Sequence, residues 1–367
     1  MGSGKKKALK IVINTGGGDA PGLNAVIRAV TLSALNRGWE VYGSPYGYLG
    51  LMDPSRLIRM TPELVAGITS RGGTILGTSN RGNPFSMVVK GKDGKEEVKD
   101  CSDTVVRNFR KLKFDGLIAV GGDGSLTIAH GLEKKGIPVI GVPKTIDNDL
   151  ESTVITFGFD TAVSTATEAI DKLHSTAESH QRVMVVELMG RHCGWIALNS
   201  GISGSADVIL IPEIPFRMEK VCEKIREIER SGRHYAIVVV AEGAVPVGGR
   251  EMTIGEKEKG REARLGGIGQ WVADQITKGT GKETRSLVLG HLQRGGSPTT
   301  FDRLIGLRFG AAAVRLAAEG RWGNMVALDP PTVKAVPLAK AVEKLKKVPT
   351  SCDSILTARE LGICFGD

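Results

Sequence analysis

The chain has 367 residues, 41% of them hydrophobic and 24% charged, which is the balance of a globular protein with about two domains. Its five cysteines form no CxxC or Cys/His pattern, so we expect free thiols in a reducing compartment and no zinc site. No apolar stretch reaches the roughly 18 residues that span a membrane, and none follows the basic start as in a secretory signal, so we expect a cytoplasmic protein.

The net charge of +9 leaves two classes of partner open. Basic proteins often bind nucleic acid, but only 5% of the residues are aromatic, and the lysines and arginines are spread along the chain. Small phosphorylated molecules also require arginine and lysine. Composition does not separate these two classes, so the motifs have to decide between them.

Short apolar runs, each ending in glycine or a polar turn, alternate with helical patterns. The runs lie at 9–22, 116–125, 137–149, 182–191, 235–244 and 286–296, and helical patterns lie at 23–38, 220–232 and 301–320. Run cores of about four to six residues, rich in Val, Ile and Leu, are typical of strands buried on both faces. The alternation predicts an α/β fold with parallel sheets, in which ligands gather beyond the carboxyl ends of the strands. We expect all the polar clusters to lie at that end.

The order of the runs predicts two sheets. The first three runs suit one sheet, and the runs at 182–191 and 235–244 suit a second. We therefore expect a domain boundary near residue 158.

Two glycine clusters each follow a run and precede a helix. They are TGGGDAPGLN at 15–24 and GGDGS at 121–125. Glycines let backbone N–H groups approach a phosphate, and a helix N-terminus favours negative charge. Asp123 adds a carboxylate suited to a hydrated metal on a nucleotide. Either cluster could instead be a tight turn, with Asp123 capping the helix.

The pentapeptide TIDND at 145–149 places two carboxylates at a strand end. One of them could accept the proton of a hydroxyl that attacks a phosphoryl group. The alternative is an Asx-turn, in which Asp and Asn bind their own backbone.

Charged residues also cluster around the later runs. Arg191 follows a strand and could reach a developing phosphoryl charge. The strand expected in the 286–296 run is surrounded by Arg285, His291 and Arg294. If that strand is regular, Arg285 and His291 lie on one face of it. Arg182 precedes a strand and Glu242 follows one. Arginines that bind phosphate and a glutamate that binds hydroxyls suit a phosphorylated sugar. The alternative for any single arginine is a solvated surface residue.

Taken together, these stretches resemble the 6-phosphofructokinase family over residues 9–320. The matching stretches are GGDAPGLNAVIR, GGDGS, TIDND, SHQRVMVVELMGR, AIVVVAEG and TRSLVLGHLQRGGSPTTFDR. The resemblance implies two similar Rossmann-like parallel-sheet domains with the active site in the cleft between them. It assigns residues 1–158 and about 294–340 to the ATP-binding domain, and residues 159–293 and about 341–367 to the fructose 6-phosphate domain.

The resemblance also implies residue roles for a glycolytic kinase that makes fructose 1,6-bisphosphate. Asp147 is the base for the sugar's 1-hydroxyl, with Thr145 beside it, and Arg191 stabilises the transferring phosphoryl. The other implied sugar contacts are Met189, Gly190, Glu242, His291 and Arg294, with Arg182 and Arg285 entering from a neighbouring subunit. A homotetramer, or a dimer, is therefore expected, without nucleic acid or membrane partners. The implied donor contacts are Gly18, Arg81, Gly82, Gly122, Asp123, Gly124 and Ser125, with Asp123 also the Mg²⁺ ligand.

Two positions bear on the phosphoryl donor. Lys144 resembles the lysine of pyrophosphate users, whereas Gly124 stands where those enzymes carry aspartate. This mixed pair is similar to an ATP-dependent branch of the family, so we expect MgATP. The alternatives are a pyrophosphate-dependent enzyme, a non-catalytic sensor, and a GGDG-containing lipid or NAD kinase, which GHLQRGG disfavours.

The effector site of bacterial members is matched only in part. Arg28 is present, but Leu32, Thr61 and His174 stand where effector arginines are expected. We do not expect the family's usual control by nucleoside diphosphate and phosphoenolpyruvate.

Overall fold

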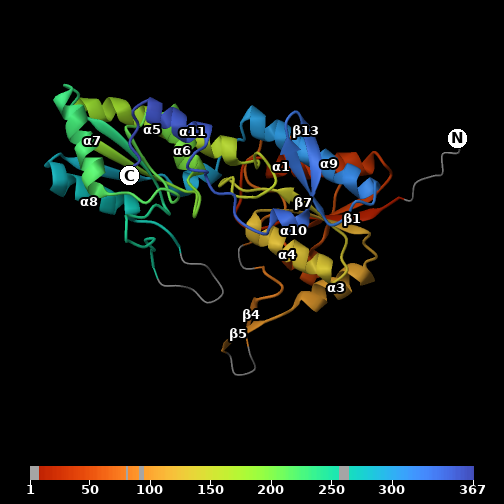
Figure 1. Cartoon of the computed structure of the whole chain (residues 1–367). Coiled ribbons are helices and arrows are strands. Elements are labelled where there is room, and N and C mark those ends of the chain that lie inside the picture. The colour runs from red at the N-terminus through yellow and green to blue at the C-terminus, as the bar shows by residue number, and fades with distance from the viewer. Residues whose placement is uncertain (1–7, 80–81, 91–94, 256–263) are drawn as a thin grey trace. The chain divides into compact units, whose positions relative to one another are not determined.

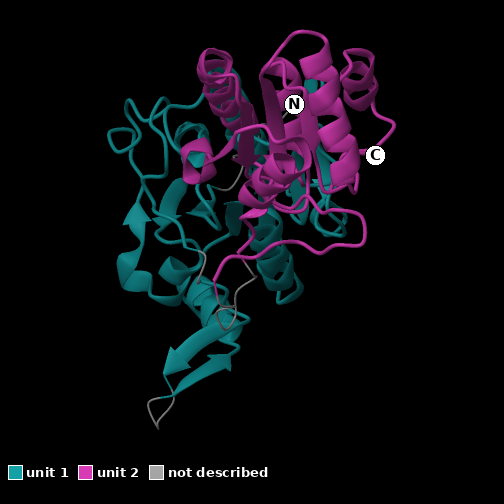
Figure 2. Ribbon diagram, turned by 90° about the vertical axis from the view of Figure 1, so that its left-hand side faces the viewer, with its two compact units in different colours: residues 1–145, 150–158, 294–345 teal, residues 146–149, 159–293, 346–367 magenta. Residues whose placement is uncertain are grey.

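The computed structural model describes residues 8–79, 82–90, 95–255 and 264–367 (Figure 1). The chain divides into two compact units, coloured separately in Figure 2. Unit 1 comprises residues 1–145, 150–158 and 294–345, and unit 2 comprises residues 146–149, 159–293 and 346–367. The TIDND segment is therefore shared, since Thr145 belongs to unit 1 and the two aspartates belong to unit 2.

Unit 1 is built on a seven-stranded sheet of order β13-β12-β7-β6-β1-β2-β3. Its strands are β1 (Lys10–Thr15), β2 (Glu40–Ser44), β3 (Ile58–Arg59), β6 (Gly116–Gly121), β7 (Val139–Pro143), β12 (Asn324–Asp329) and β13 (Thr332–Pro337). The five inner strands are parallel, while β3 and β13 pair antiparallel at the two edges. The predicted parallel sheet is confirmed, and the antiparallel edge strands are an addition to it.

Apolar side chains fill both faces of this sheet. Ile11 and Ile13 of β1 belong to one core cluster and Val12 to the other, as the alternation of a strand requires. Helices α1 (Leu23–Leu35) and α9 (Thr300–Ala318) pack together in the first cluster. The second cluster holds α3 (Ser102–Lys111), α4 (Asp123–Lys134) and α10 (Leu338–Ala341). Shorter elements are α2 (Leu49–Met52) and η1 (Pro54–Arg56).

A separate antiparallel ribbon projects from the body of unit 1 (Figure 1). It consists of β4 (Met87–Lys90) and β5 (Glu96–Lys99), whose side chains are mostly exposed. The ribbon contributes nothing to the two core clusters of unit 1, and none of the predicted site residues lies on it.

Unit 2 contains a four-stranded, entirely parallel sheet of order β11-β8-β10-β9. Its strands are β8 (Val183–Leu188), β9 (Val208–Leu210), β10 (Ala236–Ala241) and β11 (Thr284–Val288). One face carries α7 (Met218–Arg230) and α8 (Ile268–Thr280), and the other carries α5 (Phe159–His180) and α6 (Trp195–Ser203). The last helix, α11 (Asp353–Glu360), packs on α6. The predicted second sheet containing the runs at 182–191 and 235–244 is confirmed.

The strand of the 286–296 run differs from the prediction. β11 starts at Thr284 and ends at Val288, and the chain then enters the 3-10 helix η2 (Gly290–Arg294) with Gly290 at φ 51°. His291 is therefore outside the strand. The expectation that a regular strand places it on one face with Arg285 is wrong. No helix of the described residues is long and apolar enough to cross a membrane.

Candidate active site

The glycine-rich turn after β1 is packed too closely to accept side chains. The Gly16 N–H donates to the Val120 carbonyl of β6 at 2.9 Å, which ties the turn to the neighbouring strand. A Cβ added to Gly18 would lie 2.9 Å from the Arg294 Nη1. The same guanidinium donates to the Asp19 carbonyl at 3.1 Å. Sequence reasoning assigned Arg294 to the sugar phosphate, and the structure places it against this turn.

The second glycine turn meets the first at the carboxyl ends of β1 and β6. A Cβ on Gly16 would lie 2.6 Å from the Ser125 Oγ, so only glycine allows this approach. The Tyr48 hydroxyl donates to the Ser125 carbonyl at 2.6 Å, and burial raises the pKa of Tyr48, which keeps this donor protonated. Asp123 begins α4. At Gly124, an added Cβ would meet no atom within 4 Å.

Lys144 brings a cation to the same turns from the end of β7. Its side chain is buried, its N–H donates to the Gly121 carbonyl at 2.9 Å, and its Nζ donates to the Gly18 carbonyl. A Cβ on Gly122 would lie 3.5 Å from the Thr145 Cβ, so Thr145 borders the second turn. Glycine N–H groups, a helix N-terminus and an ammonium group suit a phosphate chain.

Two further predicted donor contacts have different outcomes. Gly82 is buried, and a Cβ there would lie 3.1 Å from the Leu49 Cγ. Arg81 lies outside the described residues, so its place in the donor group stays a prediction.

The aspartates of TIDND lie in unit 2 beside Cys193. Asp147 is 5% exposed and Asp149 is 9% exposed. Burial, followed by the charges of Asp149, Glu213 and Asp147, raises the pKa of the Cys193 thiol to about 12. Lys346 fixes the segment, because its N–H donates to the Asp149 carbonyl and its Nζ to the Asn148 Oδ1, each at 2.8 Å. These carboxylates are therefore close to the turn that carries Arg191, two residues before Cys193.

Arg191 occupies an uncommon backbone conformation. Gly190 has φ 141° and Arg191 has φ 50°, a left-handed value that costs a non-glycine residue about 1 kcal/mol. The Arg191 N–H donates to the Glu242 Oε1 at 3.1 Å. Gly243 leaves room for the Arg191 carbonyl, which a Cβ at that position would overlap. Met189, Gly190, Arg191 and Glu242 are thus brought together at the carboxyl ends of β8 and β10.

Glu213 also holds this turn. Its carboxylate accepts the Gly194 N–H at 3.0 and 3.1 Å and the Val348 N–H at 2.9 Å. Burial raises the pKa of Glu213, while these backbone hydrogen bonds lower it. The sequence analysis missed this residue, because no local pattern indicates that a glutamate after β9 reaches the N-terminus of α6.

Arg182 and Arg285 lie at the other end of the sheet. Both bind one carboxylate: Arg182 Nε lies 2.9 Å from the Glu283 Oε2, and Arg285 Nη2 lies 2.6 Å from the Glu283 Oε1. They flank the amino ends of β8 and β11, one strand length of about 20 Å from Arg191. The expectation that every polar cluster lies at the carboxyl ends is therefore wrong for these two arginines. His291, in η2, is exposed.

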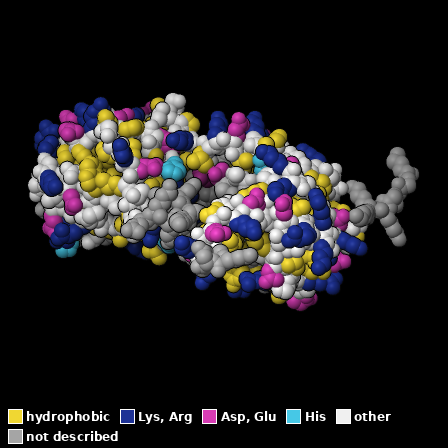
Figure 3. All heavy atoms as spheres, turned by 90° about the horizontal axis from the view of Figure 1, so that it is seen from below, with side chains coloured by type: hydrophobic (Ala, Val, Ile, Leu, Met, Phe, Trp, Pro, Cys, Tyr) yellow, Lys and Arg dark blue, Asp and Glu magenta, His cyan; other side chains and the backbone are white. Residues whose placement is uncertain are grey.

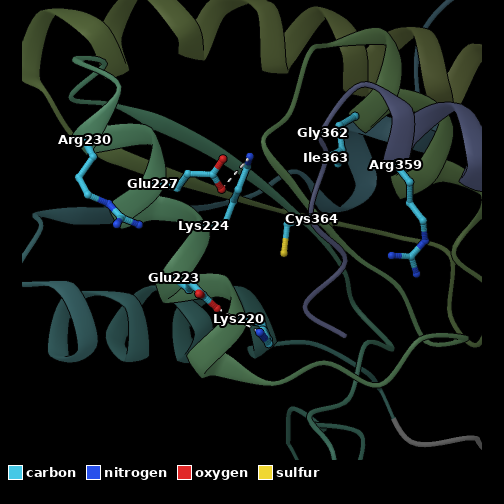
Figure 4. Close-up of a pocket in the computed structure, with 9 residues that line it drawn as sticks. All are labelled: Lys220, Glu223, Lys224, Glu227, Arg230, Arg359, Gly362, Ile363 and Cys364. Carbon is cyan, nitrogen blue, oxygen red and sulfur yellow. Dashed lines mark hydrogen bonds and ion pairs between the residues drawn. The ribbon is translucent and has the colours of Figure 1, made fainter.

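Two other surface features do not have the character of a binding site for the predicted ligands. A cavity of about 490 Å³ lies between α7 and residues 362–364 (Figure 4), but it contains none of the predicted site residues. Its lysines are matched by glutamates, with Lys220–Glu223 at 3.1 Å and Lys224–Glu227 at 3.3 Å. On the face shown in Figure 3, basic side chains are interspersed with acidic ones, which is not the basic stripe of a nucleic-acid-binding surface.

A metal centre built only from protein ligands is also absent from the described residues, in which no three His, Cys, Asp or Glu residues cluster suitably. His192 instead binds the Glu251 carboxylate through its Nδ1, at 2.7 Å.

Comparison with known proteins places these features in one family. Residues 10–317 match the family model described as Phosphofructokinase. An "ATP-dependent 6-phosphofructokinase" of Chloroflexus aurantiacus is 52% identical over 363 residues, covering 98% of this chain and 99% of the relative. A "Pyrophosphate--fructose 6-phosphate 1-phosphotransferase" of Amycolatopsis methanolica is 51% identical over 345 residues, covering 93% and 96%.

Among solved structures, phosphofructokinase of Pichia pastoris in the T-state matches with a TM-score of 0.78 and 30% identity. The alignment covers 97% of this chain but only 36% of the longer yeast chain. The two relatives, which are named for different phosphoryl donors, are almost equally similar to this chain, and each matches more than nine-tenths of it. The chain belongs to the phosphofructokinase family.

Proposed function

We propose that this protein transfers the γ-phosphoryl group of ATP to the 1-hydroxyl of fructose 6-phosphate, giving fructose 1,6-bisphosphate and ADP. The observation that carries the proposal for ATP is the open space at Gly124. The position is exposed and an added Cβ meets nothing within 4 Å, so the N-terminus of α4 leaves room for a phosphate chain longer than pyrophosphate. The ATP-dependent relative at 52% identity supports the same donor.

Asp147 is proposed as the general base. It accepts the proton of the 1-hydroxyl as that oxygen attacks the γ-phosphorus and the bond to the β-phosphate bridging oxygen breaks. A carboxylate is a normal acceptor in phosphoryl transfer, where positioning and charge stabilisation dominate the rate. The Arg191 guanidinium stabilises the charge on the γ-phosphoryl oxygens, while Thr145, Met189 and Gly190 contact the sugar.

Donor binding is proposed for the two glycine turns with Lys144. Gly18 and the segment 122–125 offer backbone N–H groups to the phosphates, with Arg81 and Gly82 as further contacts. Asp123 would hold Mg²⁺, which supplies charge neutralisation of the donor phosphates when bound. A single carboxylate beside phosphate-binding turns fits this ion, because Mg²⁺ usually binds one or two carboxylates together with substrate phosphates and water.

The sugar phosphate is proposed to bind Glu242, His291 and Arg294, with Arg182 and Arg285 supplied by a neighbouring subunit. The strand length between Arg182 and Arg191 supports this division, since arginines at opposite ends of β8 do not reach one small ligand. A homo-oligomer follows, as a tetramer or a dimer. We propose a cytoplasmic enzyme, in line with five free cysteines.

A pyrophosphate-dependent enzyme is the second candidate function. The buried Lys144 at the Gly18 carbonyl favours it, because its cation could bind a pyrophosphate and its bulk narrows the space beyond the glycine turn. The Amycolatopsis relative at 51% identity is named for this donor. A non-catalytic sensor on the same fold would need neither Asp147 nor Arg191.

The product tests the reaction. The purified protein is incubated with fructose 6-phosphate, Mg²⁺ and ATP, and ³¹P NMR follows the sugar phosphates. We expect a second phosphomonoester signal on the sugar and an equal amount of ADP. The matched control is 1-deoxyfructose 6-phosphate, which lacks the attacking hydroxyl and should give no product. ADP formation without a second sugar phosphate would contradict the proposal.

A further inference from the structure

The segment that follows β10 reaches back to the turn that carries Arg191. This segment, residues 243–255, ends in an antiparallel pairing with residues 264–266. The Ile254 N–H donates to the Arg264 carbonyl at 2.7 Å, and the Gly266 N–H donates to the Met252 carbonyl at 3.2 Å. The Met252 side chain packs against the core cluster of unit 2. Residues 252–254 are therefore fixed to residues 264–266 and to the core of unit 2, and Glu251 directly precedes them.

Glu251 forms a hydrogen bond with His192. The His192 Nδ1–H donates to the Glu251 Oε1 at 2.7 Å, with both side chains 39% exposed. The residues are 59 positions apart in sequence, so the contact joins two separate segments of unit 2. His192 follows Arg191 directly, and the Arg191 backbone is left-handed at φ 50°.

A left-handed arginine persists only when its surroundings hold it there. The turn is fixed before Arg191 by β8, at the Arg191 N–H by Glu242, and at Gly194 by Glu213. Between Arg191 and Gly194, the Cys193 N–H donates to the Gly190 carbonyl at 3.0 Å, and the His192 side chain adds a hydrogen bond to a separate segment of the chain. Without it, the Arg191 peptide group could relax toward an ordinary right-handed conformation, which would redirect the guanidinium.

We propose that Glu251, acting through His192, is a positioning residue that holds Arg191 for phosphoryl transfer. This inference rests on the proposed function, in which Arg191 stabilises the transferring phosphoryl group. Neither side chain touches substrate; the pair acts by fixing the turn. The interaction therefore contributes mainly after substrates are bound, and its loss lowers kcat more than it raises the KM for the donor.

The test compares Glu251→Ala, Glu251→Gln, His192→Ala and the double variant of both alanine changes. We expect each alanine variant to lose about 3- to 10-fold in kcat, because an imperfectly placed catalytic group costs rate and an exposed pair stores little energy. The KM for the donor should stay within about 2-fold of wild type. The double variant should be no slower than either single variant, since both remove one interaction. Glu251→Gln, which still accepts the hydrogen bond, should recover part of the rate.

The matched control is Glu223→Ala, which removes an exposed ion pair to Lys220 on α7 at 3.1 Å. It should leave kcat unchanged. A second readout needs no turnover: hydrogen exchange of a peptide covering residues 188–195 should be about 3-fold faster or more in Glu251→Ala than in wild type.

The outcomes decide the inference separately from the proposed function. A wild-type protein inactive with every donor contradicts the proposed function, and the exchange measurement still decides whether the pair holds the turn. In an active wild-type enzyme, the inference is overturned if kcat of both alanine variants stays within 2-fold, if the double variant shows additive losses, or if exchange of the 188–195 peptide is unchanged.

Discussion

Gly124 offers the sharpest mutational test of donor choice. We expect Gly124→Asp to lower kcat/KM for ATP by about 100-fold while leaving the fold intact. The position is the second residue of α4, it is exposed, and a Cβ there meets no atom within 4 Å. Aspartate is a slightly better helix residue than glycine, and a carboxylate in the first turn interacts favourably with the helix dipole. The free energy of unfolding should therefore fall by no more than about 0.5 kcal/mol, and it could increase.

The effect on ATP follows from charge. A carboxylate about 5 Å from a phosphate oxygen, at an effective dielectric constant of about 20, is repelled by about 3 kcal/mol. That energy corresponds to a loss of about 100-fold in kcat/KM for ATP. Pyrophosphate, being shorter, need not approach residue 124, and Lys144 remains at the Gly18 carbonyl to bind it. The ratio of kcat/KM for ATP to that for pyrophosphate should therefore fall by about the same factor.

The assay measures bisphosphate formation at fixed fructose 6-phosphate and Mg²⁺ over a range of each donor. Gly124→Ala is the matched control, because it adds the Cβ without the charge and should keep ATP activity within about 3-fold of wild type. If Gly124→Asp uses ATP as well as wild type does, the N-terminus of α4 does not face the donor phosphates and the reasoning from open space is wrong.

Three further variants test other parts of the account. Asp147→Ser should lower kcat by about 10²- to 10⁴-fold with the fold intact, as loss of a general base requires, and near-normal turnover would contradict that role. Glu187→Gln should lower the free energy of unfolding, measured in urea, by about 2 kcal/mol, because the buried carboxylate accepts hydrogen bonds from the N–H groups of Gly267 and Gly269. A decrease below about 0.5 kcal/mol would show that these hydrogen bonds do not stabilise the fold. The pKa of the Cys193 thiol is about 12 in the folded protein, compared with an ordinary value of 9.0. Between these two pH values only the unfolded chain loses the thiol proton. The free energy of unfolding should therefore fall as pH rises through this interval. Urea unfolding at pH 8 and pH 10.5 measures this decrease, and Cys193→Ala should reduce it; an equal decrease in wild type and variant would show that Cys193 is not its cause.

Much of the fold could be predicted because buried parallel strands leave a strong signal. The runs that became β1, β6, β7, β8 and β10 are rich in Val, Ile and Leu, and their sheet assignments are confirmed. The edges were not predictable in the same way. β3 has only two residues, and β13 is partly exposed, so neither carries a long apolar run.

The candidate site was predictable where chemistry lies in consecutive residues. The glycine turns and the TIDND segment combine unusual residue types within a few positions. In the structure, the two glycine turns lie around Lys144. Contacts between distant segments left no such signal. Glu213 and Glu251 are ordinary glutamates in sequence, and only the fold brings them to the turn of Arg191. The strand end at Val288 was likewise unpredictable, because "LVLGHL" continues the apolar pattern through Leu292.

Donor preference of the wild-type protein tests the central claim most directly. The protein is supplied with fructose 6-phosphate and Mg²⁺, and kcat/KM for bisphosphate formation is measured with ATP and with pyrophosphate in parallel. The account predicts turnover with ATP and a kcat/KM at least about 10-fold higher than with pyrophosphate, since open space at Gly124 admits the longer donor. Turnover with pyrophosphate alone would mean that Lys144 decides the donor, and it would contradict the proposal for ATP.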